Sequence, residues 1–447
     1  MTAYADQVRF QLSQGPLSAR QLIENIGISQ PTLSRAITSM GGDLVRIGAA
    51  RSIQYVLRDN RRALPDIDIF RVDTDGKLGR LGLLVPVCPE GFVMQEVGGV
   101  AHHSHSLPWW LLDMRPQGFI GRAYAARYAA MLGLPNRLAD WNDTHALRAL
   151  MAHGHDAVGN LLLGQLACER FLNVPAALPI VEQDKVQAYA RLAQEAANGE
   201  QPGSSAGGEQ PKFAALAQTA HGVRHVLVKF SLADINPVTE RWRDLLLAEH
   251  HALSTLNSGG VPAARSCVID HGGQRFLELE RFDRIGLSGR RGLFSLAALE
   301  AEFVGDASAP WPTLTRRLAK DGHIAQECAE GAALLYAFGS LIGNTDMHHG
   351  NLSFVSDQGR PYLLAPAYDM LPMGFAPGSG GSLPVHLTPL NLRAEIAAAV
   401  WSRALMLADD FLVRINADAR FTPGFRDCLT SLAQHIEDAR SKLTRLA

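Results

Sequence analysis

The sequence lacks the features of a secreted or membrane protein. Its five cysteines (Cys88, Cys168, Cys267, Cys328, Cys428) are odd in number and widely scattered, which excludes a disulfide framework and indicates a reducing compartment. There is no run of about 18 apolar residues that could span a bilayer. The N-terminus, MTAYADQVRFQLSQG, lacks the basic and then apolar order of a signal peptide. We therefore expect a cytoplasmic protein that does not contact membranes.

The sequence also lacks an excess of charge of either sign. Lysine and arginine total 42 against 44 aspartate and glutamate residues, so no overall field attracts the whole molecule to nucleic acid, and any binding of a polyanion must be local. The 447 residues are 47% hydrophobic and 19% charged, which is typical of a soluble globular protein. The length is too great for one ordinary core, so two or three domains are expected.

The first sixty residues predict a DNA-binding domain. Ser18 can cap a helix that ends at Gly27, and Ser29 with Pro31 can begin a second one. Two short helices joined by a glycine turn make a helix-turn-helix, and the strands expected over 44–47 and 52–57 would supply a wing. The side chains expected to contact phosphates and base edges are Gln30, Thr32, Ser34, Arg35 and Arg51. The alternative is a winged helix used only for protein contacts, and a homodimer would suit a palindromic DNA site.

A glycine-rich stretch in the middle of the chain precedes a lysine in a strand. NGEQPGSSAGGEQPKFAAL, residues 198–216, could cradle phosphate oxygens with its backbone N–H groups or could be a flexible linker. Lys229 follows in HVLVKF, which is how protein kinases place the lysine that holds the α and β phosphates of ATP. An edge-strand lysine facing solvent is the alternative. The next expected helix offers Glu240 or Glu249 to this lysine, and the sequence leaves the choice open.

The stretch GNTDMHHGN suggests a catalytic loop. Asp346 stands five positions before Asn351, the spacing at which kinases place a base for the incoming hydroxyl and a Mg²⁺ ligand. A buried helix over 331–343 would deliver this loop, and a hairpin would lead to Asp369 as the second metal aspartate. The polar segment from Glu280 to Phe282 suits an adenine hinge. The order of these parts is more specific than any single motif.

Histidines offer a rival metal interpretation. Asp346, His348, His349 and Asp369 could form a two-metal hydrolase centre, although the glycine loop and Lys229 would then have no role. The histidines could instead only pack and hydrogen-bond the loop, which is compatible with a kinase. We expect AHHSHS, with His102, His103 and His105, to be a solvated loop and not a metal site.

In this order, GSSAGGEQPKF, VLVKF, LELERFDR, GNTDMHHGN and AYDML resemble the HipA family of serine/threonine protein kinases, the toxins of bacterial toxin–antitoxin modules. The resemblance implies that Asp346 is the catalytic base and that Asn351 and Asp369 hold Mg²⁺. It implies autophosphorylation of Ser205, with Ser204 adjacent, which ejects the loop and silences the kinase. The nucleotide-binding residues that it implies are Ser205, Gly207, Gly208, Gln210, Lys212, Lys229, Glu280, Phe282 and His348.

The expected fold class is α+β. Residues 1–62 would form the winged helix-turn-helix, residues 63–282 a HipA-like N-terminal region with the kinase N-lobe, and residues 283–447 a mainly α C-lobe. HipA-type kinases usually pair with a separate helix-turn-helix antitoxin, whereas here such a domain is fused to the kinase, as in the long YjjJ-type variant. This fusion leaves the antitoxin partner open.

These observations predict an ATP- and Mg²⁺-dependent serine/threonine kinase with a fused DNA-binding domain. Its protein substrate is unknown and, by resemblance to the family, translation-related. One alternative is a DNA-binding regulator with a nucleotide-sensing pseudokinase. Another is a metal-dependent DNA hydrolase.

Overall fold

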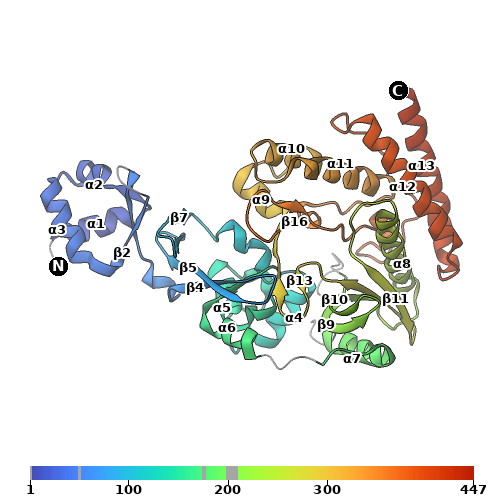
Figure 1. Cartoon of the computed structure of the whole chain (residues 1–447), viewed down its shortest axis with the longest axis horizontal. Coiled ribbons are helices and arrows are strands. Elements are labelled where there is room, and N and C mark those ends of the chain that lie inside the picture. The colour runs from blue at the N-terminus through green and yellow to red at the C-terminus, as the bar shows by residue number, and fades with distance from the viewer. Residues whose placement is uncertain (1–2, 49–51, 174–177, 198–209, 447) are drawn as a thin grey trace.

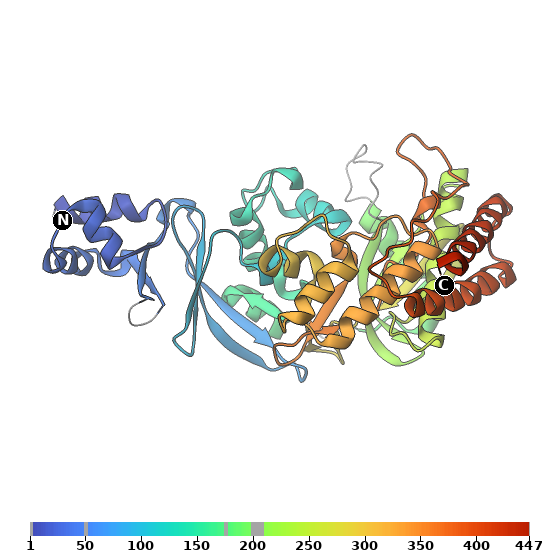
Figure 2. The same cartoon turned by 90° about the horizontal axis from the view of Figure 1, so that it is seen from above.

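The computed structural model describes residues 3–48, 52–173, 178–197 and 210–446. The molecule is elongated, with the N-terminal segment at one end and the two last helices, α12 (Ala398–Ala417) and α13 (Arg426–Leu446), at the other (Figures 1 and 2). Among the described residues, no helix is both long and apolar enough to cross a membrane.

The N-terminal segment packs three helices against a small sheet. The helices are α1 (Ala3–Leu12), α2 (Ala19–Ile26) and α3 (Gln30–Met40), and the strands run in the order β1 (Leu17–Ser18), β3 (Gln54–Leu57), β2 (Leu44–Ile47). Ser18 caps α2 in a capping box with Gln21, and Gly27 ends it at φ 73°. Both predicted ends of this helix are therefore confirmed, because each residue satisfies backbone groups that the helix itself leaves unpaired.

The β2–β3 hairpin is packed against the next domain. Val45, Ile47 and Val56 form one apolar cluster with Val85 and Val93 of the neighbouring sheet. All five side chains are buried, so water is excluded from this contact. The N-terminal segment is therefore attached by a hydrophobic interface as well as by the chain.

The middle domain is a five-stranded antiparallel sheet with helices beside it. The strand order is β7 (Ala101–Ser104), β6 (Phe92–Glu96), β5 (Leu78–Pro86), β4 (Ile67–Val72), β8 (Leu161–Leu163), and the helices are α4 (Gly118–Tyr128), α5 (Asp143–His153) and α6 (Gly164–Asn173). The expectation of a loop at AHHSHS was wrong for residues 101–104. These residues pair with β6 as an edge strand, with His103 opposite Val93.

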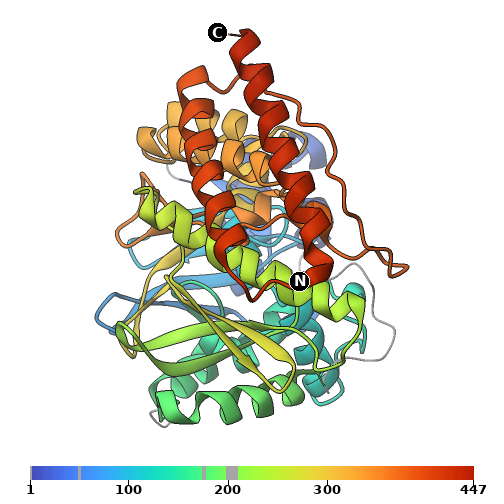
Figure 3. The same ribbon diagram turned by 90° about the vertical axis from the view of Figure 1, so that its right-hand side faces the viewer.

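A second sheet follows, covered by a helix on each face. Its order is β11 (Ser266–His271), β12 (Gln274–Glu280), β10 (Gly222–Phe230), β9 (Lys212–Thr219). Alternate side chains of β12 face opposite ways: Phe276 packs toward α7 (Lys185–Ala197), whereas Leu277 and Leu279 pack toward α8 (Pro237–Ser258). Figure 3 shows the sheet between these two helices.

The C-terminal part is mainly helical and holds the largest apolar core. Its helices are α9 (Leu296–Phe303), α10 (Trp311–Lys320), α11 (Gln326–Leu341), α12 and α13, and its strands are β13 (Arg284–Ile285), β14 (Gly289–Arg290), β15 (Gly292–Ser295), β16 (Ser353–Ser356) and β17 (Leu363–Leu364). The helix predicted over 331–343 lies largely in α11, most of which is buried. The chain leaves the end of α11 directly into GNTDMHHGN.

Candidate nucleotide site

Lys229 lies at the centre of the site. Its neighbours in β10, Val228 and Phe230, pack on the α7 side of the sheet, so strand alternation directs Lys229 toward α8. Its Nζ lies 2.7 Å from both carboxylate oxygens of Glu249 and is also ion-paired with Asp369. Of the two glutamates that the sequence offered, Glu249 is the partner. Glu240 lies instead beside Arg243, at 3.8 Å.

The three charged groups of this triad shift one another's pKa. Burial alone lowers the pKa of a lysine, but Asp369 and Glu249 outweigh burial and raise the pKa of Lys229. Burial likewise raises the pKa of a carboxyl, yet the attraction of Lys229 holds the pKa of Asp369 below its usual range. Burial raises the pKa of the fully buried Glu249. Lys212, which stands opposite Lys229 in β9, adds a second positive charge that acts on both carboxyls. Asp369, 29% exposed, is the carboxylate of the triad that a bound cation could reach.

The loop after α11 is tied to Asp369 by a buried asparagine. The Asn344 side chain donates from Nδ2 to the Asp369 carbonyl oxygen at 3.2 Å and accepts the Asp346 N–H at 3.0 Å. Asn351 donates from Nδ2 to the Asp346 carbonyl oxygen at 2.8 Å. The Asp346 carboxylate is 52% exposed. The structure thus brings Asp346, Asn351 and Asp369 together through Asn344, which the sequence reasoning missed although it stands just beyond the end of α11.

Asp369 has an unusual backbone. Its φ of 51° is in the left-handed region, which residues other than glycine rarely adopt. Strain of this kind is found where the surrounding structure fixes a functional group. Here the Asn344 bond to the carbonyl and the Lys229 ion pair to the carboxylate hold the residue from both sides.

The two loop histidines form hydrogen bonds that hold the loop. His348 accepts the Gly350 N–H at Nδ1, at 3.0 Å, and its Nε2 lies 3.9 Å from the Asp346 carboxylate. His349 Nε2 lies 2.8 Å from the Ala309 carbonyl, which can only accept, so this nitrogen carries the proton. The described residues contain no group of three or more His, Cys, Asp or Glu side chains arranged to hold a metal. Magnesium needs only one or two protein ligands beside waters and phosphates, so Asn351 and Asp369 fit it.

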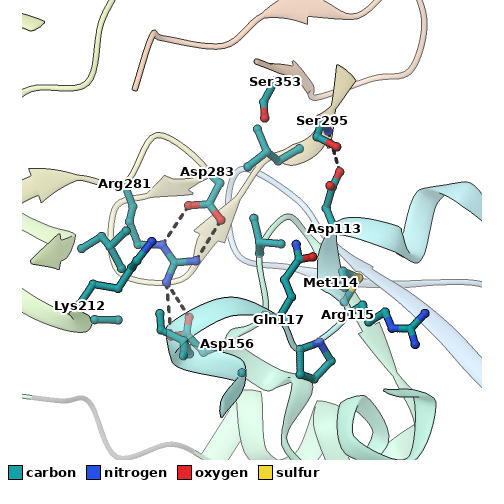
Figure 4. Close-up of a pocket in the computed structure, with 18 of the residues that line it drawn as sticks. Asp113, Met114, Arg115, Gln117, Asp156, Lys212, Arg281, Asp283, Ser295 and Ser353 are labelled. Carbon is teal, nitrogen blue, oxygen red and sulfur yellow. Dashed lines mark hydrogen bonds and ion pairs between the residues drawn. The ribbon is translucent and has the colours of Figure 1, made fainter. Parts of the chain in front are cut away.

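A cavity of about 600 Å³ lies beside the triad, within the range of small-molecule sites. The residues from the second sheet and the C-terminal part that line it are Lys212, Ala214, Leu227, Lys229, Ala264, Leu279–Asp283, Leu293, Ser295, Gly350, Ser353, Tyr368 and Asp369. Figure 4 shows Lys212, Arg281 and Asp283 among them. The predicted adenine hinge therefore lines the same cavity as the predicted phosphate lysine.

The hinge residues have distinct surroundings. The Glu280 N–H donates to the Arg265 carbonyl at 2.9 Å, and the Glu280 carboxylate accepts from the Thr219 hydroxyl at 2.8 Å. The backbone N–H and the carboxylate of Glu280 are therefore both used in hydrogen bonds that hold the end of β12. The Phe282 ring lies against Tyr368, with centroids 5.8 Å apart, next to Asp369. Phe282 is therefore placed to contact a base.

Of the predicted residues in the glycine-rich stretch and the DNA-binding segment that the structure describes, Lys212 alone lines this cavity. Ser204, Ser205, Gly207, Gly208 and Arg51 lie outside the described residues. Gln210 lies two residues before Lys212, the first residue of β9. Of the expected DNA contacts, Gln30, Ser34 and Arg35 are exposed on α3 and Thr32 is partly buried. Helix α3 lies at the end of the molecule away from the kinase lobes (Figure 1).

Comparisons with known proteins match almost the whole chain. A family model described as "YjjJ-like toxin, middle domain" matches residues 64–172, and one described as "HipA-like C-terminal domain" matches residues 204–435. Toxin YjjJ of Escherichia coli (strain K12) is 37% identical over 439 residues, 97% of this chain and 98% of the relative. The chain belongs to the HipA family as a YjjJ-like toxin.

The HipA-like fold is also found among solved structures. HipA of Shewanella oneidensis MR-1, solved with HipB and operator DNA, aligns with a TM-score of 0.57 and 16% identity over 85% of this chain and 97% of its own. The HipA-like region of this YjjJ-like toxin contains Lys229, Glu249, Asp346, Asn351 and Asp369. Residues 1–63 precede both matched domains.

Proposed function

We propose that this YjjJ-like toxin is an ATP- and Mg²⁺-dependent serine/threonine protein kinase. The observation that carries the proposal is the placement of Lys229 between Glu249 and Asp369 at the wall of a nucleotide-sized cavity. The second, partly exposed carboxylate and its bond to the Asp346 loop through Asn344 have a use in phosphoryl transfer, where positioning and charge neutralisation supply most of the catalysis.

Each residue has a defined role in this reaction. Mg²⁺, held by Asn351 and Asp369, would neutralise charge on the transferred phosphoryl group. Lys229 positions the nucleotide phosphates. The acceptor hydroxyl forms a bond to the γ-phosphorus while the bond from that phosphorus to the bridging oxygen breaks, ADP leaves, and Asp346 takes the hydroxyl proton. The acceptor is a protein serine or threonine, and Ser205 is the proposed self-acceptor.

We also propose that residues 1–62 are a winged helix-turn-helix that binds DNA. Its support is the polarity of α3: Leu33, Ala36 and Met40 are buried, whereas Gln30, Ser34 and Arg35 are exposed. Thr32 and Arg51 complete the proposed contacts. HipA of S. oneidensis is recorded with a separate HipB and operator DNA. In this chain the DNA contact would come from its own N-terminal segment, as a homodimer on a palindromic site.

Intact-mass measurement after incubation with ATP and Mg²⁺ tests the kinase. Wild type, shown to start unphosphorylated, is compared with Asp346→Asn, which alters a half-exposed carboxylate, and with Asp321→Asn, an exposed aspartate after α10. A phosphate gained by wild type and Asp321→Asn but not by Asp346→Asn, mapped to Ser204 or Ser205, supports the proposal. ATP binding without transfer would favour the nucleotide-sensing regulator. Metal-dependent DNA cleavage without ATP would favour the hydrolase.

A further inference from the structure

The cavity that Lys229 and Asp369 line has a second wall from the middle domain. It comes from residues 113–121 and 149–158 of the middle domain, and Figure 4 shows Asp113 and Gln117 on it, facing the strands that carry Ser295 and Ser353. A nucleotide with its phosphates at Lys229 and its base at the hinge would have its sugar between them. The middle-domain wall lines this same cavity.

Asp113 is connected to Asp369, the proposed Mg²⁺ ligand, by a short series of contacts. Its Oδ2 accepts the Ser295 N–H at 2.6 Å, and Ser295 pairs with Ser353 across β15 and β16. The Ser353 hydroxyl lies 2.6 Å from the Tyr368 hydroxyl, and Tyr368 directly precedes Asp369. Asp113 is therefore positioned against the cavity wall, where both the N–H and the hydroxyl of Ser295 hydrogen-bond its carboxylate.

Gln117 occupies a helix-capping position without capping the helix. It stands before α4 with extended backbone (φ −152°, ψ 165°), and its side chain makes no hydrogen bond to the helix N-terminus, which is the usual task of a residue there. In Figure 4 its amide extends into the cavity between Asp113 and Asp156. An amide in this position can donate to and accept from a ligand.

The other carboxylates on this side are already neutralised. Asp283 pairs with Arg284 at 2.7 Å and with Arg281 at 3.0 Å, and it accepts the Gly159 N–H at 3.1 Å. Asp156 pairs with the same two arginines, at 2.9 and 3.3 Å. These ion pairs fix the middle domain to the hinge. Asp113 and Gln117 take no part in these ion pairs.

We propose that Asp113 and Gln117 recognise the ribose hydroxyls of the nucleotide, so that the middle domain determines sugar specificity. This inference rests on the proposed kinase function. A carboxylate accepts from a sugar hydroxyl, as at the ribose of dinucleotide sites, and the amide supplies both a donor and an acceptor.

Binding of ATP, 2′-deoxy-ATP and 3′-deoxy-ATP to the full chain tests the inference by calorimetry. Asp113→Asn keeps an acceptor for the Ser295 N–H, and Gln117→Ala changes an exposed side chain; Gln165→Ala, exposed on α6 of the same domain, is the control. Wild type and the control should bind at least one deoxy analogue about three- to tenfold more weakly than ATP, as expected for one hydrogen bond. That ratio should fall to about one in Gln117→Ala or Asp113→Asn, mainly through weaker binding of ATP.

The ratio of the dissociation constant of a deoxy analogue to that of ATP separates recognition from folding, because a structural defect would weaken the binding of all three nucleotides alike. Equal ratios in wild type and both variants would overturn the role of the middle domain while leaving the kinase intact. Failure of wild type to bind any of the three nucleotides would instead overturn the kinase proposal, and this inference with it.

Discussion

The triad of Lys229, Glu249 and Asp369 predicts different effects on stability when Lys229 and when Asp369 is replaced. Lys229→Met leaves Glu249, which is fully buried, and Asp369 without a counter-charge. Removing one partner of a buried ion pair costs about 3–5 kcal/mol, because an uncompensated charge stays in the interior. At 2–4 °C per kcal/mol for a domain of this size, the melting temperature should fall by about 6–20 °C.

Asp369→Asn should behave differently because Lys229 keeps Glu249 as its partner. Both carboxylates contact the same nitrogen, so they repel each other by roughly 3 kcal/mol at the effective dielectric constant of a protein interior. The substitution relieves this repulsion while it loses the attraction to Lys229. Asparagine also tolerates the left-handed backbone, here at φ 51°. We expect the free energy of unfolding to change by less than about 1 kcal/mol, while phosphoryl transfer is lost.

Thermal unfolding of the two variants, followed by tryptophan fluorescence without nucleotide or metal, measures this contrast. Glu249→Gln in the Lys229→Met background is the matched control, since it removes the stranded charge and should restore much of the lost stability. Equal destabilisation by Asp369→Asn and Lys229→Met would refute the reasoning, because Asp369 would then be the main partner of the lysine.

Three further predictions test other parts of the chain. Asn344→Ala should lower phosphoryl transfer at least tenfold by freeing the loop from Asp369, which autophosphorylation rates measure. Burial lowers the pKa of His250 to about 4, so the unfolded chain takes up this proton first, and up to roughly 3 kcal/mol of stability should be lost as pH falls from 6.5 to 4. Denaturation of His250→Gln should show a smaller loss. Arg35→Ala should weaken operator binding and reduce the slope of log affinity against log salt by about 1, with kinase activity unchanged.

Local signals in the sequence predicted much of the fold. The ends of α2 followed from Ser18 and Gly27, and the apolar spacing of residues 331–343 predicted most of α11. These predictions succeed because capping and periodicity act within a few residues. The strand at His102 and His103 was missed because an edge strand depends on pairing with β6, which the polar sequence of AHHSHS does not indicate.

Contacts between distant segments explain what the sequence could not give. Spacing indicated Lys229 and Asp369, but only the turn of α8 relative to β10 distinguishes Glu249 from Glu240. Asn344 acts through the carbonyl of a residue 25 positions away. The middle-domain wall has no motif of its own, since its position beside the hinge depends on ion pairs such as that between Asp156 and Arg284.

The unfavourable features of the site are concentrated where the surroundings can hold them. The buried charges of the triad and the left-handed backbone of Asp369 are each destabilising by themselves. Both features lie between the second sheet and the loop after α11. Helix α11 is part of the largest apolar core. That core can offset such a cost, whereas an isolated loop could not. The strained backbone of Asp369 and the burial of charge around Lys229 are therefore better explained by the binding of a ligand than by the stability of the free protein.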